Sequence, residues 1–158
     1  TTDKAGEGER IALRQLSASK ANGATRLQFW ITHLCCCAAG LAAAPGELPH
    51  EDERVELPLV APAAATECLA DLLALYGEGL CRPLPLFPKS AWAFARQLRQ
   101  KHDAEGAMAK ARAAFEGSNV YIARAFTDVE AALGEEFAAL AGRVFAPLLA
   151  AEAGEPAS

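Results

Sequence analysis

The chain has 158 residues, of which 52% are hydrophobic, enough to bury the core of one domain. Its net charge of −5 argues against a free-standing DNA-binding protein, because such proteins usually carry a basic surplus. The apolar run 31–44 is too short to span a bilayer, and nothing in the polar, charged N-terminus resembles a signal peptide. We therefore expect a soluble, cytoplasmic protein.

The two ends differ in composition from the rest. The chain begins at Thr1 and its single methionine is Met108, which favours an excised or processed fragment. Residues 1–9 are polar and predict a disordered N-terminal edge, and residues 152–158 predict a frayed tail. Residues 10–151 then form the predicted domain.

The first predicted element is a strand over residues 10–17, in which apolar residues alternate with others. An Asn22-Gly23 turn leads into the clearest helix, over residues 24–41. We expect Arg26 and Gln28 to lie off the apolar face of this helix. That face is predicted to consist of Leu27, Trp30, Ile31, Leu34 and Leu41.

The middle of the chain predicts a polar connection over residues 48–56, which overlaps a short strand over residues 55–60. Pro62 suits the first turn of the next helix, which Gly77 and Gly79 are expected to close. The predicted apolar face of that helix contains Leu69, Leu72, Leu73 and Tyr76. Prolines 83, 85 and 88 predict an extended segment.

The last third of the chain predicts further helices. Pro88 begins one that runs through Leu98, a polar break follows over residues 100–105, and the next covers residues 107–115. Residues 127–130 have the form of a capping box. The last long helix carries Leu133, Phe137, Leu140, Val144 and Leu148 in register. The chain is thus expected to be α+β, mostly helical with a few short strands.

No catalytic, cofactor-binding or metal-binding residue is predicted. No GxSxG, P-loop or GxGxxG pattern occurs. His33 falls on the predicted polar flank of its helix and is expected to be capped or to face solvent. Three consecutive cysteines, Cys35 to Cys37, cannot all bind one metal from a helix, so we expect reduced cysteines that act as small apolar residues.

Two basic groups are candidates for contact with DNA or with another subunit. In the first, Lys89, Arg96 and Arg99 accompany Trp92 near a helix N-terminus that could face a phosphate. The pattern favours the simpler alternative of a structural tryptophan with solvated basic neighbours. The second group surrounds the first strand and turn and consists of Arg10, Arg14, Lys20 and Arg26. It could contact either DNA or an acidic surface of a partner protein. The candidate contact residues are Lys20, Arg26, Lys89, Trp92 and Arg96.

Four segments, in order along the chain, resemble the C-terminal domain of RecC, the gamma subunit of the RecBCD exodeoxyribonuclease V. The most specific is Pro-Leu-Pro-Leu-Phe-Pro-Lys-Ser at residues 83–90, which extends to residues 75–80 and 91–93. The others are residues 16–20 with 26–34, residues 110–126 in part, and residues 135–140 with 144–149. Phe115 stands where a tryptophan is expected, and the triple cysteine has no counterpart in this pattern.

The resemblance implies a relation to the restriction-endonuclease-like fold, as in the nuclease domain of RecB, but without its active site. Such nucleases hold Mg²⁺ with an aspartate and an acidic residue two positions before a lysine. The matching segment, residues 10–20, contains no acidic residue, so Lys20 lacks the carboxylates that would give it a catalytic task. Glu7 and Glu9 precede it and are expected to be solvated.

The resemblance also implies a function. RecC takes part in double-strand break repair, where it helps to separate the DNA strands and inspects single-stranded DNA for Chi. The chain would supply scaffold and contacts to RecB, RecD or DNA, with no cofactor, and the isolated fragment is expected to self-associate through exposed apolar surface. The alternatives are a Mg²⁺-dependent nuclease, disfavoured by the missing carboxylates, and an unrelated helical interaction module, disfavoured by the four ordered segments.

Overall fold

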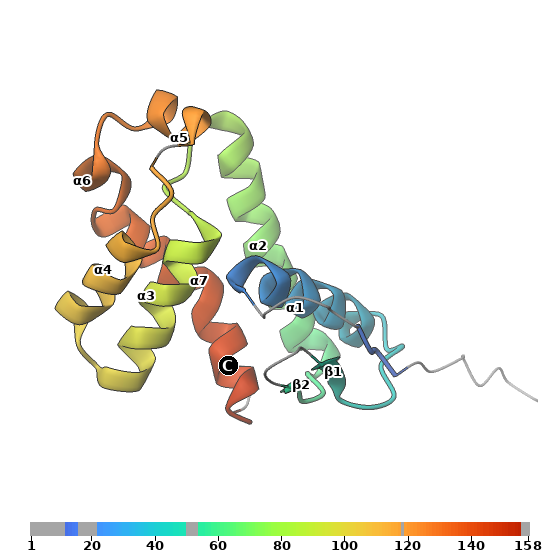
Figure 1. Ribbon diagram of the computed structural model, residues 1–158. Helices are drawn as coiled ribbons and strands as arrows, with labels where there is room; N and C mark the ends of the chain where they lie inside the picture. Colours follow the sequence, from blue (N-terminus) through green and yellow to red (C-terminus); the bar gives the residue numbers. More distant parts are fainter. Residues whose placement is uncertain (1–11, 16–21, 50–53, 118, 156–158) are drawn as a thin grey trace, which may run out of the picture.

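Figure 1 shows the computed structural model, which describes residues 12–15, 22–49, 54–117 and 119–155. The predicted edge at residues 1–9 and the candidate Lys20 lie outside these ranges. The described part is mostly helical with one two-stranded sheet, which confirms the α+β expectation, while the relation to a nuclease fold stays a prediction. The elements are α1 (Gly23–Ala38), β1 (Gly46–Pro49), β2 (Arg54–Leu57), α2 (Pro62–Cys81), α3 (Pro88–Lys101), α4 (Ala104–Ala113), α5 (Val120–Ala125), α6 (Val129–Ala132) and α7 (Glu135–Glu152).

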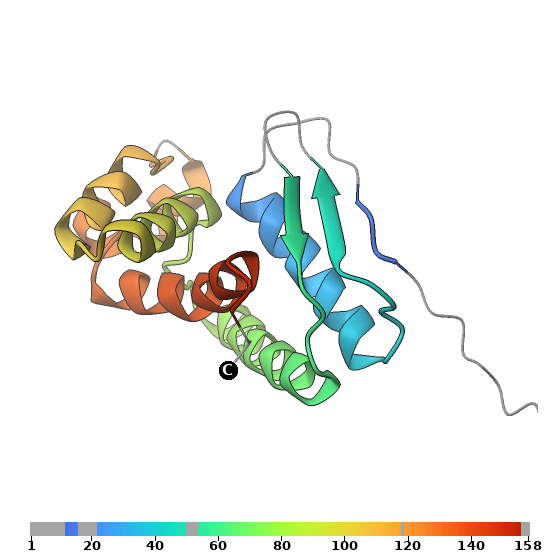
Figure 2. The ribbon, with the colours of Figure 1, turned by 90° about the horizontal axis from the view of Figure 1, so that it is seen from below.

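A β-hairpin lies along α1 (Figure 2). Strands β1 and β2 pair antiparallel, from Gly46 opposite Leu57 to Pro49 opposite Arg54. The predicted polar connection over residues 48–56 is therefore wrong at both ends, because its first residues belong to β1 and its last residues belong to β2. Strand β2 ends at Leu57 rather than at residue 60, since Pro58 has no N–H to donate to a ladder.

Residues 12–15 run beside β1, so part of the predicted first strand is extended. Arg14 forms an isolated parallel bridge with Glu47. The backbone N–H of Gln15 donates to the Glu47 carbonyl at 3.0 Å, and the Glu47 N–H donates to the Leu13 carbonyl at 3.0 Å. The remainder of the predicted strand lies outside the described residues.

Helix α1 begins at Gly23, one residue before the predicted start, because the Asn22 side chain accepts a hydrogen bond from the Thr25 N–H at 3.0 Å. It ends at Ala38 rather than at residue 41. Its buried face differs from the predicted one. Ile31 and Leu41 are exposed and Leu27 is half-buried. The buried side chains are Arg26, Phe29, Trp30, His33, Leu34 and Cys37. The helix packs against α2 and α3, which widens its buried face beyond a simple apolar stripe.

His33 is fully buried, so the expectation of a capped or solvent-facing histidine is wrong. Its Nε2 donates a hydrogen bond to the Pro58 carbonyl at 2.8 Å, just after β2. Burial lowers the pKa of His33 below its ordinary value, although the bond to Pro58 opposes this shift. The ring is therefore held neutral, and it joins α1 to the hairpin as a structural residue.

Helix α3 packs against α4 on one side and α7 on the other. Phe94 of α3 meets Phe137 of α7 edge to face, with ring centroids 5.7 Å apart. The predicted register of the last helix is confirmed for its buried residues Phe137, Leu140, Val144 and Leu148. Leu133 is also buried, but it is not part of the last helix as predicted. It is the C-cap of α6, and Gly134 then precedes the start of α7.

Several predicted boundaries need correction. Helix α2 continues through Gly77 and Gly79 to Cys81. Helix α3 extends to Lys101, inside the predicted break, and His102 ends it with a φ of 52°. Helix α4 starts at Ala104, where the Asp103 side chain caps the Gly106 N–H. The cap before α6 is Asp128 rather than Thr127, and its carboxylate accepts from the Ala131 N–H at 2.7 Å.

No helix within these ranges is both long and apolar enough to cross a lipid bilayer.

Candidate functional site

Three of the predicted contact residues come together. Arg26 of α1 and Trp92 and Arg96 of α3 line one cavity of about 350 Å³. The C-terminal end of α7 closes the other side with Leu149, Glu152 and Ala153. This basic cleft thus joins α1, α3 and α7, which the sequence places far apart.

Arg26 is the structural centre of the basic cleft. Its side chain is 4% exposed, and Nη1 donates to Glu152 Oε1 at 2.6 Å. The guanidinium carbon lies 4.7 Å from the centroid of the Trp92 ring, within the range of a cation–π interaction. The expectation that Arg26 lies off the buried face is therefore wrong, because Glu152 supplies the opposite charge inside the fold.

Trp92 is also structural. Its ring is buried and meets Phe145 of α7 edge to face, with centroids 5.7 Å apart. Arg96 is exposed at the mouth of the cleft and makes no ion pair with any described residue. Arg99, one turn further along α3, pairs with Glu155 at 2.6 Å. Arg96 and Arg99 are thus the cations that this cleft offers to a ligand.

Lys89 lies at the opposite end of α3. Its exposed ammonium group forms an ion pair with Glu116, in the segment after α4. The helix starts at Pro88 with Phe87 as its N-cap, and no side chain caps this turn. Lys89 therefore lies outside the basic cleft, but it is on the same helix, α3, as Arg96 and Arg99.

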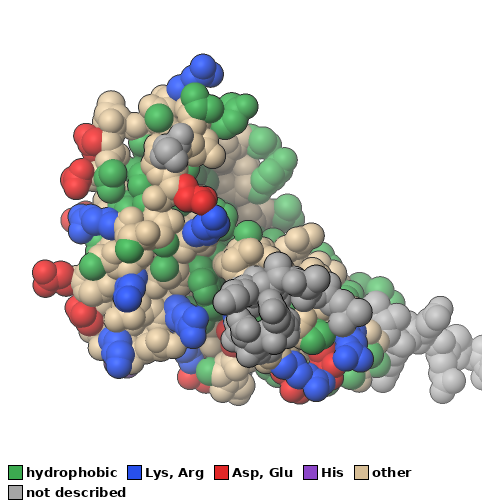
Figure 3. Space-filling view, viewed as in Figure 1, with side chains coloured by type: hydrophobic (Ala, Val, Ile, Leu, Met, Phe, Trp, Pro, Cys, Tyr) green, Lys and Arg blue, Asp and Glu red, His purple; other side chains and the backbone are tan. Residues whose placement is uncertain are grey.

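An apolar groove lies between α1 and the second half of α2. Its cavity of about 420 Å³ is lined by uncharged residues, among them Ile31, Leu72, Leu75, Tyr76, Leu80 and Leu84. Tyr76, Leu80 and the neighbouring Leu73 are largely exposed, and Figure 3 shows hydrophobic side chains along the outer side of α2. We call this surface the α1–α2 groove.

The sequence predicted part of this surface, but as core. Leu73 and Tyr76 were expected on the buried face of α2, whereas the residue buried in this half of the helix is Leu75. Apolar residues at 69, 72, 73, 75, 76 and 80 fall within an arc of about 160° around the helix axis, wider than the usual apolar stripe of roughly 100°. A stripe so wide exceeds what one packing partner can cover, and this width was the available signal of a second contact surface.

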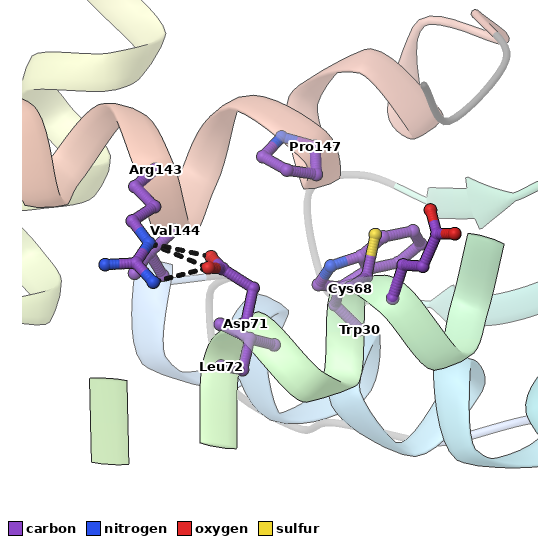
Figure 4. Close-up of a pocket in the computed structure, with 8 residues that line it drawn as sticks. Trp30, Cys68, Asp71, Leu72, Arg143, Val144 and Pro147 are labelled. Atoms are coloured by element: carbon purple, nitrogen blue, oxygen red, sulfur yellow. Dashed lines mark hydrogen bonds and ion pairs between the residues drawn. The ribbon is translucent and has the colours of Figure 1, made fainter. Parts of the chain in front are cut away.

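Figure 4 shows a smaller cavity of about 220 Å³ between α2 and α7. Arg143 of α7 reaches Asp71 of α2, and its Nε donates to the two carboxylate oxygens at 2.8 and 3.0 Å. These hydrogen bonds lower the pKa of Asp71. Burial raises the pKa of the Cys68 thiol in the same cavity. The carboxylate is engaged and the thiol protonated, so this cavity is a helix contact with no activated nucleophile.

Within the described ranges, no three His, Cys, Asp or Glu side chains are arranged to hold a metal ion. The five cysteines are free, and Cys37 is buried with its Sγ 3.6 Å from His33 Nε2. The candidate sites among the described residues are therefore two surfaces, the basic side of α3 and the α1–α2 groove.

Comparison with known protein families identifies a match for this chain. A family model described as the RecC C-terminal domain matches residues 5–99, which is more than half of the chain. The match covers α1, the β-hairpin, α2 and nearly all of α3, and so includes every lining residue of the α1–α2 groove except Val144 of α7. No curated protein matches the chain.

Proposed function

The chain belongs to the RecC C-terminal domain family, and from this premise we propose that it is a non-catalytic part of a RecBCD-type exodeoxyribonuclease V. Such a part acts in the processing of DNA double-strand breaks in the bacterial cytoplasm. It contributes scaffold and contacts to the RecB or RecD subunit. The chemistry resides in other parts of the complex.

The α1–α2 groove is the observation that carries this proposal. A contiguous apolar surface that contains exposed leucines and a tyrosine is unusual on a free-standing monomer and typical of a protein interface. The nearby charges of Arg82 and Glu136 already pair with each other at 2.6 Å. An apolar segment of a neighbouring subunit therefore suits the groove better than a charged one.

The non-catalytic part of the proposal rests on the sequence. Residues 10–20, the segment that the resemblance would match to the strand of an active nuclease, contain no Asp or Glu. A Mg²⁺-dependent nuclease needs carboxylates at that position to hold the ion and to activate water. The family relationship is thus compatible with a nuclease-like ancestor whose active site is lost.

A pair of tyrosines provides the test. Tyr76, in the groove, is 66% exposed, and Tyr121, on α5 and outside the groove, is 75% exposed. We expect Tyr76→Ser to weaken the capture of purified RecB or RecD by about tenfold or more, as the loss of an interface aromatic does. Tyr121→Ser is the matched control and should leave capture unchanged. Equal effects of the two substitutions would contradict docking through the groove.

The same surface should cause self-association when no partner subunit is present. In sedimentation velocity at high concentration, we expect the chain to form dimers or larger species, and Tyr76→Ser to reduce them. A chain that remains monomeric at every concentration would show that the groove does not mediate self-association, and this result would weaken the proposal.

A further inference from the structure

Positive charge is concentrated on the α3–α4 hairpin. Residues 88–114 contain six lysines and arginines against two acidic residues, a net charge of +4, whereas the whole chain has a net charge of −5. Figure 3 shows Lys and Arg side chains over the α3 and α4 side of the molecule. An acidic protein that keeps one basic surface has a surface suited to a negatively charged partner.

Three of these cations form a strip along one side of α3. At 100° per residue, Lys89, Arg96 and Arg99 fall within about 80° of one another around the helix axis. They span about 15 Å along that axis. Lys101 projects to the other side, roughly 120° or more from the three. We call Lys89, Arg96 and Arg99 the α3 strip.

The outer two members of the α3 strip are held by glutamates. Lys89 pairs with Glu116 and Arg99 pairs with Glu155, whose side chains are both more than half exposed. Arg96, between them, makes no ion pair with any described residue. Exposed pairs of this kind contribute little to stability, so another anion can replace either glutamate at small cost.

We propose that the α3 strip binds successive phosphates of a DNA strand, and that Glu116 and Glu155 occupy its outer cations while no DNA is bound. Arginine suits this role because its guanidinium group can bind two oxygens of one phosphate. Trp92 lies beside the strip, but Arg26 covers its ring, so the ring is closed to stacking with a base. The contact is therefore with the backbone and independent of base sequence.

That the phosphates belong to DNA rests on the proposed function, whereas the binding itself can be measured on the chain alone. The measurement is fluorescence anisotropy of a short labelled oligo-dT with the full 158-residue chain at low salt. We expect Arg96→Gln to weaken binding about tenfold. Lys89→Gln should weaken it several-fold and reduce the dependence of log K on log salt by about 1, and Lys101→Gln, the matched control, should do neither.

The glutamates give a prediction of opposite sign. Glu116→Gln and Glu155→Gln each remove a competing carboxylate, so both should bind the oligonucleotide several-fold more tightly than the unchanged chain. A glutamate with a purely structural role would not show this gain.

Equal losses in Lys89→Gln and Lys101→Gln would overturn the proposal, because they would indicate a general charge effect. So would unchanged or weaker binding in both glutamate variants, or no binding by the unchanged chain. None of these residues lines the α1–α2 groove, so capture of RecB or RecD tests the subunit role separately. Failure of one assay with success of the other therefore identifies which proposal is wrong.

Discussion

Arg26→Met is expected to lower the free energy of unfolding by about 3 kcal/mol, because it removes one member of a largely buried ion pair. The Arg26 side chain is 4% exposed and that of Glu152 is 18% exposed, so water cannot fully solvate the remaining carboxylate. The substitution also removes the cation from the Trp92 ring. Urea denaturation followed by tryptophan fluorescence measures the loss.

Two controls separate burial from charge. The double variant Arg26→Met with Glu152→Met should regain most of the lost stability, since no buried charge then remains. Arg82→Met removes a cation of equal charge that pairs with Glu136 but is 49% exposed, and it should cost far less stability than Arg26→Met. If Arg26→Met costs no more than Arg82→Met, the α1–α3–α7 junction does not depend on this pair.

Gly23→Ala is expected to be about as severe, at roughly 3 kcal/mol, because it forces apart the starts of α1 and α3. An added Cβ would lie 2.4 Å from the Trp92 Cβ and 2.6 Å from the Pro88 carbonyl oxygen. Neither atom belongs to the free end of a flexible side chain, so the helices themselves must move. The same denaturation experiment measures this effect.

Gly77→Ala is the matched control for Gly23→Ala. Gly77 lies within α2, where an added Cβ meets nothing within 4 Å. Alanine is the better helix former by about 0.5–1 kcal/mol, so this substitution should stabilise the chain. Losses of similar size at both positions would mean that the close approach of α1 and α3 does not explain the effect of Gly23→Ala.

The sequence predicted helices well where one face alone is buried. Helix α7 shows this, because Phe137, Leu140, Val144 and Leu148 recur at helical spacing and point to one core. Helix α1 is different, since it packs against α2, α3 and α7 and neighbours a hairpin. Its polar residues Arg26 and His33 are buried with partners, and hydrophobic periodicity cannot report a buried polar residue.

Those partners are distant in sequence. Arg26 is 126 positions from Glu152, and His33 is 25 positions from Pro58. Only tertiary packing brings either pair together. The hairpin was hidden for a local reason, because Glu47 and Pro49 give β1 no run of strand-forming residues.

The candidate site was predictable to the extent that it lies on one helix. The spacing of Lys89, Trp92 and Arg96 was sufficient to place basic residues and an aromatic along α3. It could not show that Arg26 covers the Trp92 ring, or that Glu116 and Glu155 hold the outer cations. The α1–α2 groove was missed because its exposed tyrosine and leucines have the same hydrophobicity as core residues.

The most direct test of the central claim combines capture of cognate RecB and RecD by this chain with a Mg²⁺-dependent nuclease assay on the same sample. We expect binding of a partner subunit and no DNA cleavage by the chain alone, as a non-catalytic RecC domain requires. Cleavage by the chain alone that Lys20→Ala abolishes would contradict this account, because it would show that a working nuclease site remains.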